Sequence, residues 1–417
     1  MSVPSAGSGP VSTTGEPPPW RRPYRFVMLA GLWLLYAAFG MVARALFPLV
    51  TPILADLRMT YGQMGLVMGS WQLTYIGAAV FVGFFIDRWG VRHSLFLGAV
   101  VMALSVGLRY FAGSFPVFLA LVALFGVGGP MISVGCPKTI ALWFAGRERA
   151  IAVGIYTTGP WIGGAVALAA TNRWILPLAG HSWRGAFAVY GAITLAVAFL
   201  WWGLAGDLEA REDSGREGMR RVVAALLTVR NIQLVLAAGL LSFALSHGLT
   251  SWLPNILERK GFSPEAAGFA ASIPLLAGVP AMLLLPWWIP ARGRGPAVSA
   301  LALLATVSVW GLFAFDGLPM LCGVVLYGAA SAALFPLLTL ILMDAPEVGA
   351  GRMGAAAGLF FCVAEVGGFL SPLAIGLLVD WTGSFQWGAY FLMGVGLLIL
   401  LLGALVRDPL PPRPSPA

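Results

Sequence analysis

Apolar segments of about 20 residues dominate this chain, and each is long enough to cross the hydrocarbon core of a membrane as a helix. The 417 residues are 59% hydrophobic and only 10% charged, with a mean hydropathy of +0.87. A soluble core of this size would not use so much apolar surface. We therefore expect an all-α membrane protein with about twelve transmembrane helices, over residues 26–55, 61–86, 93–112, 116–144, 149–176, 184–205, 231–256, 264–289, 296–315, 318–343, 351–379 and 385–406.

Basic residues are distributed unevenly among the loops between these segments. If the amino terminus is cytoplasmic, most of the 25 lysine and arginine residues fall on the cytoplasmic side, including Arg21, Arg22 and Arg25 before the first segment. Cytoplasmic loops of membrane proteins carry such an excess. We expect a multi-pass protein of the inner (plasma) membrane with both termini in the cytoplasm, and the formal net charge of +8 then requires no nucleic-acid partner.

The first segment and the cysteines give no sign of a secreted protein. The first apolar segment is too long for a signal peptide and has no small-residue cleavage site behind it, so we expect a retained helix. Cys136, Cys322 and Cys362 all fall within predicted helices. An odd number of cysteines in such positions does not indicate a disulfide framework.

A polar stretch of mixed charge divides the chain nearly in half. It predicts a cytoplasmic tail at 1–25, a six-helix domain at 26–205, a cytoplasmic linker at 206–230, a second six-helix domain at 231–406 and a cytoplasmic tail at 407–417. The two halves also resemble each other. Residues 204 positions apart match for Gly154 and Gly358, Gly163 and Gly367, Gly164 and Gly368, Trp183 and Trp387, and Phe187 and Phe391, while Gly65 and Gly268 are 203 positions apart. Parallel six-helix repeats of this kind occur in secondary transporters.

Between the second and third predicted helices stands the sequence Gly83-Phe84-Phe85-Ile86-Asp87-Arg88-Trp89-Gly90-Val91-Arg92. It closely resembles the G-x-x-x-D-R-x-G-x-R signature of the major facilitator superfamily. The resemblance implies the twelve-helix fold of that family and a cytoplasmic latch formed by Gly83, Asp87, Arg88, Gly90 and Arg92. The acid can interact with the amino-terminal end of a helix, and the arginines can hold carbonyls or carboxylates. An ordinary basic loop would explain the arginines but not the acid and the two glycines.

The fifth predicted helix contains Gly159-Pro160-Trp161-Ile162-Gly163-Gly164, which resembles the G-P-x-x-G-G core of a motif of drug and proton antiporters. The chain departs from that motif at Ile155, where a glycine is expected. Two interpretations stay open. Gly159, Pro160, Gly163 and Gly164 belong to an antiporter motif, or they form a packing groove and a bend that neighbouring helices relieve.

Three ionisable residues, Arg44, Lys138 and Glu365, lie inside apolar segments, where an uncompensated charge costs about 3 to 10 kcal/mol. Such residues mark substrate, ion or proton pathways. We expect Arg44 and Lys138 to attract an anion, although each is long enough to reach the nearer membrane surface instead. Glu365 lies near the middle of its segment, so it is either the counter-ion of a buried cation or a proton carrier.

The residues that follow Arg44 support the same expectation. The sequence Arg44-Ala45-Leu46-Phe47-Pro48-Leu49-Val50-Thr51-Pro52-Ile53-Leu54 resembles the first-helix pattern of bacterial cyanate and nitroimidazole permeases. The resemblance implies a small anionic or strongly polar substrate.

Four further polar residues are candidates for the substrate site. His247 could relay protons because its unperturbed pKa is about 6.5, or it is a hydrogen-bonded core histidine. Tyr36, Tyr156 and Thr157 offer neutral hydrogen-bond donors to a central site, although tyrosines in such segments also serve in packing.

The sequence contains no motif of an enzyme: it lacks a P-loop, an H-E-x-x-H, a Cys-x-x-Cys and a G-x-S-x-G. We expect no catalytic activity, no cofactor and no metal. The prediction is a secondary active transporter, a monomer that moves a small anion or polar organic solute by alternating access. Its partners would be that small-molecule substrate, protons or a counter-substrate, and membrane lipids. Two alternatives remain, a drug or hydrophobic-compound proton antiporter and a non-transporting membrane sensor or scaffold.

Overall fold

The computed structural model describes residues 23–206 and 219–406, without the side chains of residues 80, 83, 84, 87, 219–222 and 349–351. All regular secondary structure in these residues is helical. The first half contains α1 (Tyr24–Arg44), η2 (Phe47–Leu49), α2 (Val50–Leu57), α3 (Tyr61–Gly107), η3 (Leu108–Phe111), α4 (Phe115–Trp143), α5 (Gly146–Thr157), α6 (Gly159–Ala170), the π-helical turn η4 (Thr171–Ile175), α7 (Leu176–Leu178) and α8 (Trp183–Leu204). The second half contains α10 (Arg230–Arg259), α11 (Pro264–Trp288), η5 (Ala291–Gly293), α12 (Arg294–Ala314), α13 (Gly317–Met343), α14 (Gly349–Thr382) and α15 (Gln386–Leu405).

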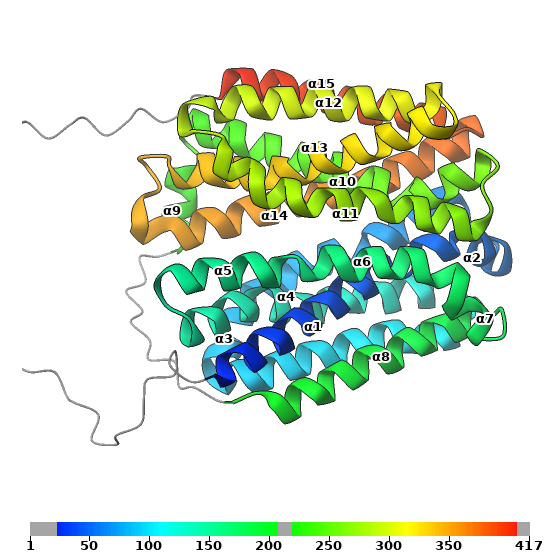
Figure 1. Cartoon of the computed structure of the whole chain (residues 1–417), viewed down its shortest axis with the longest axis horizontal. Coiled ribbons are helices and arrows are strands. Elements are labelled where there is room, and N and C mark those ends of the chain that lie inside the picture. Colours follow the sequence, from blue (N-terminus) through cyan, green and yellow to red (C-terminus); the bar gives the residue numbers. More distant parts are fainter. Residues whose placement is uncertain (1–22, 207–218, 407–417) are drawn as a thin grey trace, which may run out of the picture.

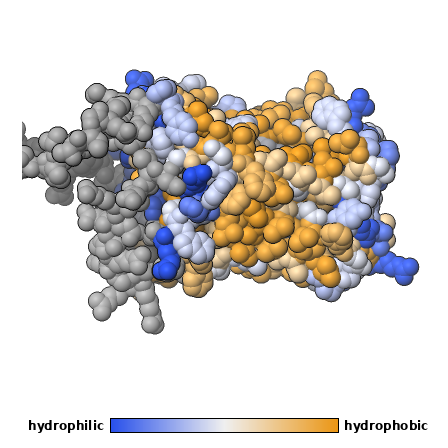
Figure 2. All heavy atoms as spheres, turned by 90° about the horizontal axis from the view of Figure 1, so that it is seen from below, coloured by the Kyte–Doolittle hydropathy of each residue, from blue (hydrophilic) through white to orange (hydrophobic). Residues whose placement is uncertain are grey.

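Helix length and surface chemistry both fit a membrane. Within the described residues, 11 segments are long and apolar enough to cross one. The remaining expected segment, 61–86, is the first part of α3, whose helical geometry continues until Gly90 interrupts it with a φ of 73°. Figure 2 shows a broad band of hydrophobic atoms between two hydrophilic ends of the molecule. The prediction of an all-α membrane protein is confirmed.

Two of the predicted membrane segments are present as single spans but contain a break in the helix. The segment expected at 26–55 breaks after Arg44, because Pro48 has no N–H to donate and its ring crowds the preceding turn. The segment expected at 149–176 changes from α5 to α6 at Thr158, next to Pro160. The linker expected at 206–230 also contains a short helix, α9 (Met219–Leu226).

The two halves form two helical bundles that lie side by side, with α1 to α8 in one and α10 to α15 in the other (Figure 1). They meet where α3 packs on α14 and α6 packs on α11. Glycines bring these helices close together: a Cβ at Gly65 would lie 2.4 Å from the carbonyl oxygen of Pro372, and one at Gly268 would lie 2.4 Å from that of Leu168. Since Gly65 and Gly268 are matched positions, the two contacts repeat each other across the interface.

Polar bonds also join the halves at the end of the molecule that carries α2 and α7, opposite the end where α1 begins (Figure 1). The hydroxyl of Thr51 on α2 donates to the carboxylate of Glu258 on α10 at 2.7 Å. The side-chain amide of Asn255 donates to the same hydroxyl at 3.0 Å. These contacts hold the two halves together at this end.

Candidate functional site

The break after α1 positions Arg44 between the two halves. Arg44 stands in the last turn of α1, where the free carbonyl groups of the helix favour a cation. Its side chain lies on Gly164 of α6, because a Cβ at Gly164 would be 2.3 Å from the Cδ of Arg44. Gly164 therefore leaves the space that the arginine occupies.

The internal repeat places His247 opposite Arg44. His247 on α10 is 203 positions after Arg44, and Gly368 on α14 is 204 positions after Gly164. A Cβ at Gly368 would lie 3.5 Å from the Cγ of His247, as the one at Gly164 would lie against Arg44. The same framework thus presents two basic side chains, one from each half, to the centre of the molecule.

Gly164 and Gly368 each also face a residue from the opposite half, and these two residues differ in polarity. A Cβ at Gly164 would lie 3.1 Å from the Cδ2 of Leu275 on α11, whereas one at Gly368 would lie 3.3 Å from the Nε2 of Gln72 on α3. Gln72 and Leu275 are 203 positions apart and are repeat partners. An amide stands in the first half where the second half has an apolar side chain.

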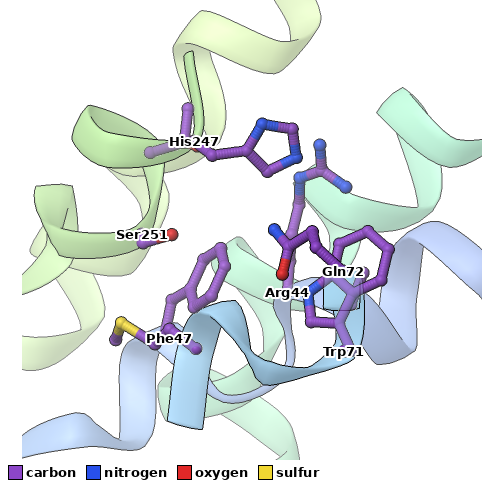
Figure 3. Close-up of a pocket in the computed structure, with 9 residues that line it drawn as sticks. Arg44, Phe47, Trp71, Gln72, His247 and Ser251 are labelled. Carbon is purple, nitrogen blue, oxygen red and sulfur yellow. The ribbon is translucent and has the colours of Figure 1, made fainter. Parts of the chain in front are cut away.

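A small cavity lies between these side chains (Figure 3). Its volume is about 10 Å³, close to the least space that can hold one water molecule. The guanidinium of Arg44 points toward the ring of His247, with Gln72 and Trp71 beside it (Figure 3). The lining consists of Ala43, Arg44, Phe47, Met68, Trp71 and Gln72 from the first half and His247, Thr250 and Ser251 from the second.

Several buried polar atoms around the cavity have no hydrogen-bond partner among the described residues. They include Nε of Arg44, both Nε2 and Oε1 of Gln72, and Oε2 of Glu365. Glu365 on α14 is 3% exposed, and its Oε2 would lie 3.4 Å from a Cβ at Gly368. Buried polar groups are almost always hydrogen-bonded in folded proteins. This group of atoms is therefore suited to a polar ligand that enters between the halves.

His247 can present a hydrogen-bond acceptor to the same space. Its Nδ1 lies 3.2 Å from the carbonyl oxygen of Phe243, one turn earlier on α10. A carbonyl only accepts, so Nδ1 carries the proton of this bond, and the neutral ring then has its lone pair on Nε2. The ring also lies 6.4 Å from that of Trp71, which belongs to the opposite half.

Comparison with known proteins identifies the family. The sequence profile of the Major Facilitator Superfamily matches residues 32–372. The chain belongs to the major facilitator superfamily. It is a multi-pass membrane transporter and not an enzyme, and the resemblance found in the Gly83–Arg92 signature is confirmed.

Individual relatives of this facilitator include transporters of anions. The hexuronate transporter of Bacillus subtilis (strain 168) is 25% identical over 404 residues, which cover 92% of this chain and 93% of the relative. The probable sulfoacetate transporter of Cupriavidus necator is 25% identical over 415 residues, which cover 93% and 95%. The crystal structure of a bacterial homologue of the human lysosomal transporter Spinster superposes with a TM-score of 0.75 at 16% identity, covering 92% of this chain and 96% of that one. The last comparison supports the fold alone.

Five of the predicted site residues lie outside the lining of the cavity: Glu365, which lies beside it at Gly368, and Lys138, Tyr36, Tyr156 and Thr157. Lys138 is half-buried on α4. Tyr36 lies two helical turns before Arg44, about 12 Å along α1, and packs against Tyr156 at 5.8 Å between ring centres. The hydroxyl of Thr157 donates to its own helix, at 2.9 Å to the carbonyl of residue 153. A role for these residues in binding stays a prediction.

For the predicted latch of this facilitator, the side chain of Asp87 and the surroundings of Gly83 lie outside what the structure describes. Gly90 has φ 73° and ψ 166°, a conformation that suits glycine alone. Arg92 donates to the carbonyl oxygen of Trp202 at 2.8 Å and lies over its indole ring at 4.8 Å. Arg92 thus ties α3 to α8 within its own half, while Arg88 is exposed.

The glycine-rich motif of α6 packs closely on α1. A Cβ at Gly163 would lie 1.9 Å from the carbonyl oxygen of Ala37, and one at Gly159 would lie 3.0 Å from that of Trp33. The backbone of Pro160 in turn lies against Gly40. These contacts give the motif a packing role, whatever compound the protein transports, and Gly164 adds the contact with Arg44.

Sequence reasoning overlooked Gln72 as a site residue. An isolated glutamine in an apolar segment carries no charge and belongs to no motif. The internal repeat contained the signal, because Gly65 and Gly268 fix an offset of 203 and the same offset pairs Gln72 with Leu275. Where one half has a polar residue and the other half has an apolar residue at the matched position, the two halves differ in chemistry.

Proposed function

We propose that this facilitator transports a small organic anion by alternating access, with both termini in the cytoplasm and with protons or a second solute as the coupled species. The observation that carries the proposal is the placement of Arg44. Its buried Nε has no partner among the described residues, and it faces a cavity formed by both halves. A guanidinium in this position can bind a carboxylate through two parallel hydrogen bonds.

The second half supplies two titratable groups whose protonation can depend on the anion bound at Arg44. Glu365 and His247 both lie near Gly368, and each can hold or release a proton. An anion bound to Arg44 brings negative charge close to Glu365, which favours the protonated acid. Binding of the anion and of a proton would therefore support each other, as proton symport requires.

The structure is compatible with a site that opens and closes. The cavity is too small for an organic anion while the halves are joined by Thr51 and Glu258. A substrate can enter only when the halves move apart on one side, and rigid-body rocking of repeats about a central site is the usual means in such transporters. The substrates in the names of the two relatives, hexuronate and sulfoacetate, are both anions.

The test is transport in proteoliposomes. The expected result is counterflow of small carboxylates or sulfonates that is lost in Arg44→Ala. The matched control is Arg292→Ala, which removes one positive charge from the exposed turn between α11 and α12. Counterflow of anions that persists in Arg44→Ala would overturn the proposal, and transport of lipophilic cations without anions would favour the drug antiporter.

A further inference from the structure

Gln72 is directed to the interface between the halves by the spacing of residues on α3. Gly65, Gly69 and Gln72 lie on one face of the helix, since residues three and four positions apart are neighbours on its surface. Cβ atoms at Gly65 and Gly69 would lie 2.4 Å and 2.6 Å from carbonyl oxygens of α14. The same face therefore carries the amide of Gln72 against the second half, where the side chain is 1% exposed.

The amide of Gln72 stands beside Glu365 without bonding to it. Nε2 of Gln72 and Oε2 of Glu365 would lie 3.3 Å and 3.4 Å from the same point, a Cβ at Gly368, yet each lacks a hydrogen-bond partner among the described residues. Oε1 of Gln72 also lacks one. Whichever way the amide is turned, it offers one donor group and one acceptor to the cavity.

A bare carboxylate supplies only acceptors to this arrangement. Its oxygens can pair with Arg44 and with the NH₂ of Gln72, but the substrate then offers no donor to the amide oxygen. A buried acceptor without a hydrogen bond has lost its water and gained no partner, so the full free energy of its desolvation is uncompensated. A hydroxyl can donate its one proton to the amide oxygen of Gln72 and accept a hydrogen bond from the protonated carboxyl group of Glu365, the form that a bound anion favours.

We infer that Gln72 recognises a hydroxyl group on the substrate, and that the preferred substrates are hydroxycarboxylates, with the carboxylate on Arg44 and the hydroxyl on Gln72 and Glu365. This inference rests on the proposed function and narrows it. The two relatives described above do not decide the matter, because a hexuronate carries hydroxyl groups and sulfoacetate carries none. The geometry around Gly368 favours the first kind of anion.

The experiment compares pairs of acids that differ by one hydroxyl: lactate with propionate, and malate with succinate. Each is tested as a competitor of counterflow and as a stabiliser of the purified protein in thermal unfolding, because a ligand that binds only the folded form raises its apparent stability. We expect the wild-type protein to prefer the hydroxy acid of a pair by about tenfold or more. In Gln72→Leu the preference should fall to about twofold or less, because the variant lacks the amide oxygen that requires a donor.

The control variant is Gln386→Leu, which makes the same change at a half-buried glutamine at the start of α15. It should keep the preference of the wild type. Binding of propionate or succinate by Gln72→Leu would show that the variant is folded. A further probe needs no variant: 2-fluoropropionate has an acceptor but no donor at the position of the hydroxyl, so it should compete as weakly as propionate.

The outcomes separate this inference from the proposed function. Equal binding of both acids of a pair by the wild type, or an unchanged preference in Gln72→Leu, overturns the role of Gln72 while anion transport stands. Competition by 2-fluoropropionate as strong as that of lactate overturns it as well. If no carboxylate or sulfonate binds to the wild type, the proposed function itself fails.

Discussion

The carboxylate of Asp380 on α14 accepts a hydrogen bond of 2.8 Å from the backbone N–H of Tyr61 on α3, and the two residues belong to opposite halves of the protein. Its second oxygen accepts one of 2.7 Å from the N–H of Gly62. The first N–H groups of a helix have no partner within the helix, so Asp380 satisfies two of them across the interface. Arg259 of α10 adds a bond of 2.9 Å to the hydroxyl of Tyr61.

These contacts predict that Asp380→Asn opens the end of the molecule that carries α2. The neutral amide keeps the size of the side chain but weakens two charge-assisted hydrogen bonds. We expect the ratio of open to closed molecules to rise by about tenfold, which corresponds to about 1.4 kcal/mol. Distances between spin labels at residues 58 and 266, placed in exposed segments of the two halves after the cysteines are replaced, would measure the change.

Asp316→Asn is the matched control for this variant. Asp316 lies at the start of α13 and pairs with Lys260 at 2.9 Å, so both partners belong to the second half. Its removal should leave the label distances unchanged. Equal distances in Asp380→Asn and the wild type would show that the bonds to α3 do not hold this end closed.

A second prediction concerns the packing of α6 on α1. Gly163→Ala would place a methyl group 1.9 Å from the carbonyl oxygen of Ala37, so the two helices must separate. Such overpacking costs about 1 to 3 kcal/mol, and we expect a lower midpoint of thermal unfolding in detergent. The control is Gly358→Ala, at a helical glycine where the added methyl group would have no atom of a neighbouring element within 4 Å; it should be neutral or slightly stabilising. Equal stability of the two variants would contradict the packing role.

The sequence predicted the helices well because a long apolar segment has few alternatives in a membrane. It predicted their breaks poorly. Pro48 is visible in the sequence, but prolines are tolerated within membrane helices, so its effect depends on neighbours that only the fold supplies. The break matters for the site because it ends α1 at Arg44.

The sequence also indicated some of the residues that meet around the cavity but not others. Arg44, His247 and Glu365 meet near the cavity, and each was a polar group deep inside an apolar segment. Lys138 satisfied the same criterion but neither lines the cavity nor is among the nearest neighbours of Gly164 or Gly368, because depth in a segment does not tell which face of the helix a residue occupies. The offset between the two repeats indicates which helix faces correspond. It pairs His247 with Arg44, and it pairs Gln72 with the apolar Leu275.

The contact between Gly164 and Arg44 gives a third prediction. Gly164→Ala would place a methyl group 2.3 Å from the Cδ of Arg44 and 3.1 Å from Leu275, so the arginine must move within the cavity. We expect the apparent affinity for an anion to fall by about tenfold or more, since a buried hydrogen-bonded charge pair is sensitive to such a shift. The expected loss of thermal stability is smaller than in Gly163→Ala, because a side chain yields more readily than a backbone. Unchanged affinity in counterflow assays would show that the guanidinium does not bind the substrate.

The fourth prediction separates binding from coupling at Glu365. Glu365→Gln keeps the size and the hydrogen-bonding capacity of a protonated acid but can no longer release a proton. If Glu365 carries the proton, the variant should still exchange one anion for another, because exchange needs no net proton movement. Accumulation driven by a pH gradient should fall to a ratio of about one, since the free energy of the gradient is then no longer coupled to the substrate. Glu265→Gln, at the exposed start of α11, is the control and should accumulate substrate as the wild type does. Accumulation by Glu365→Gln at the wild-type level would assign the proton to another group and leave Glu365 as the counter-ion of a buried cation.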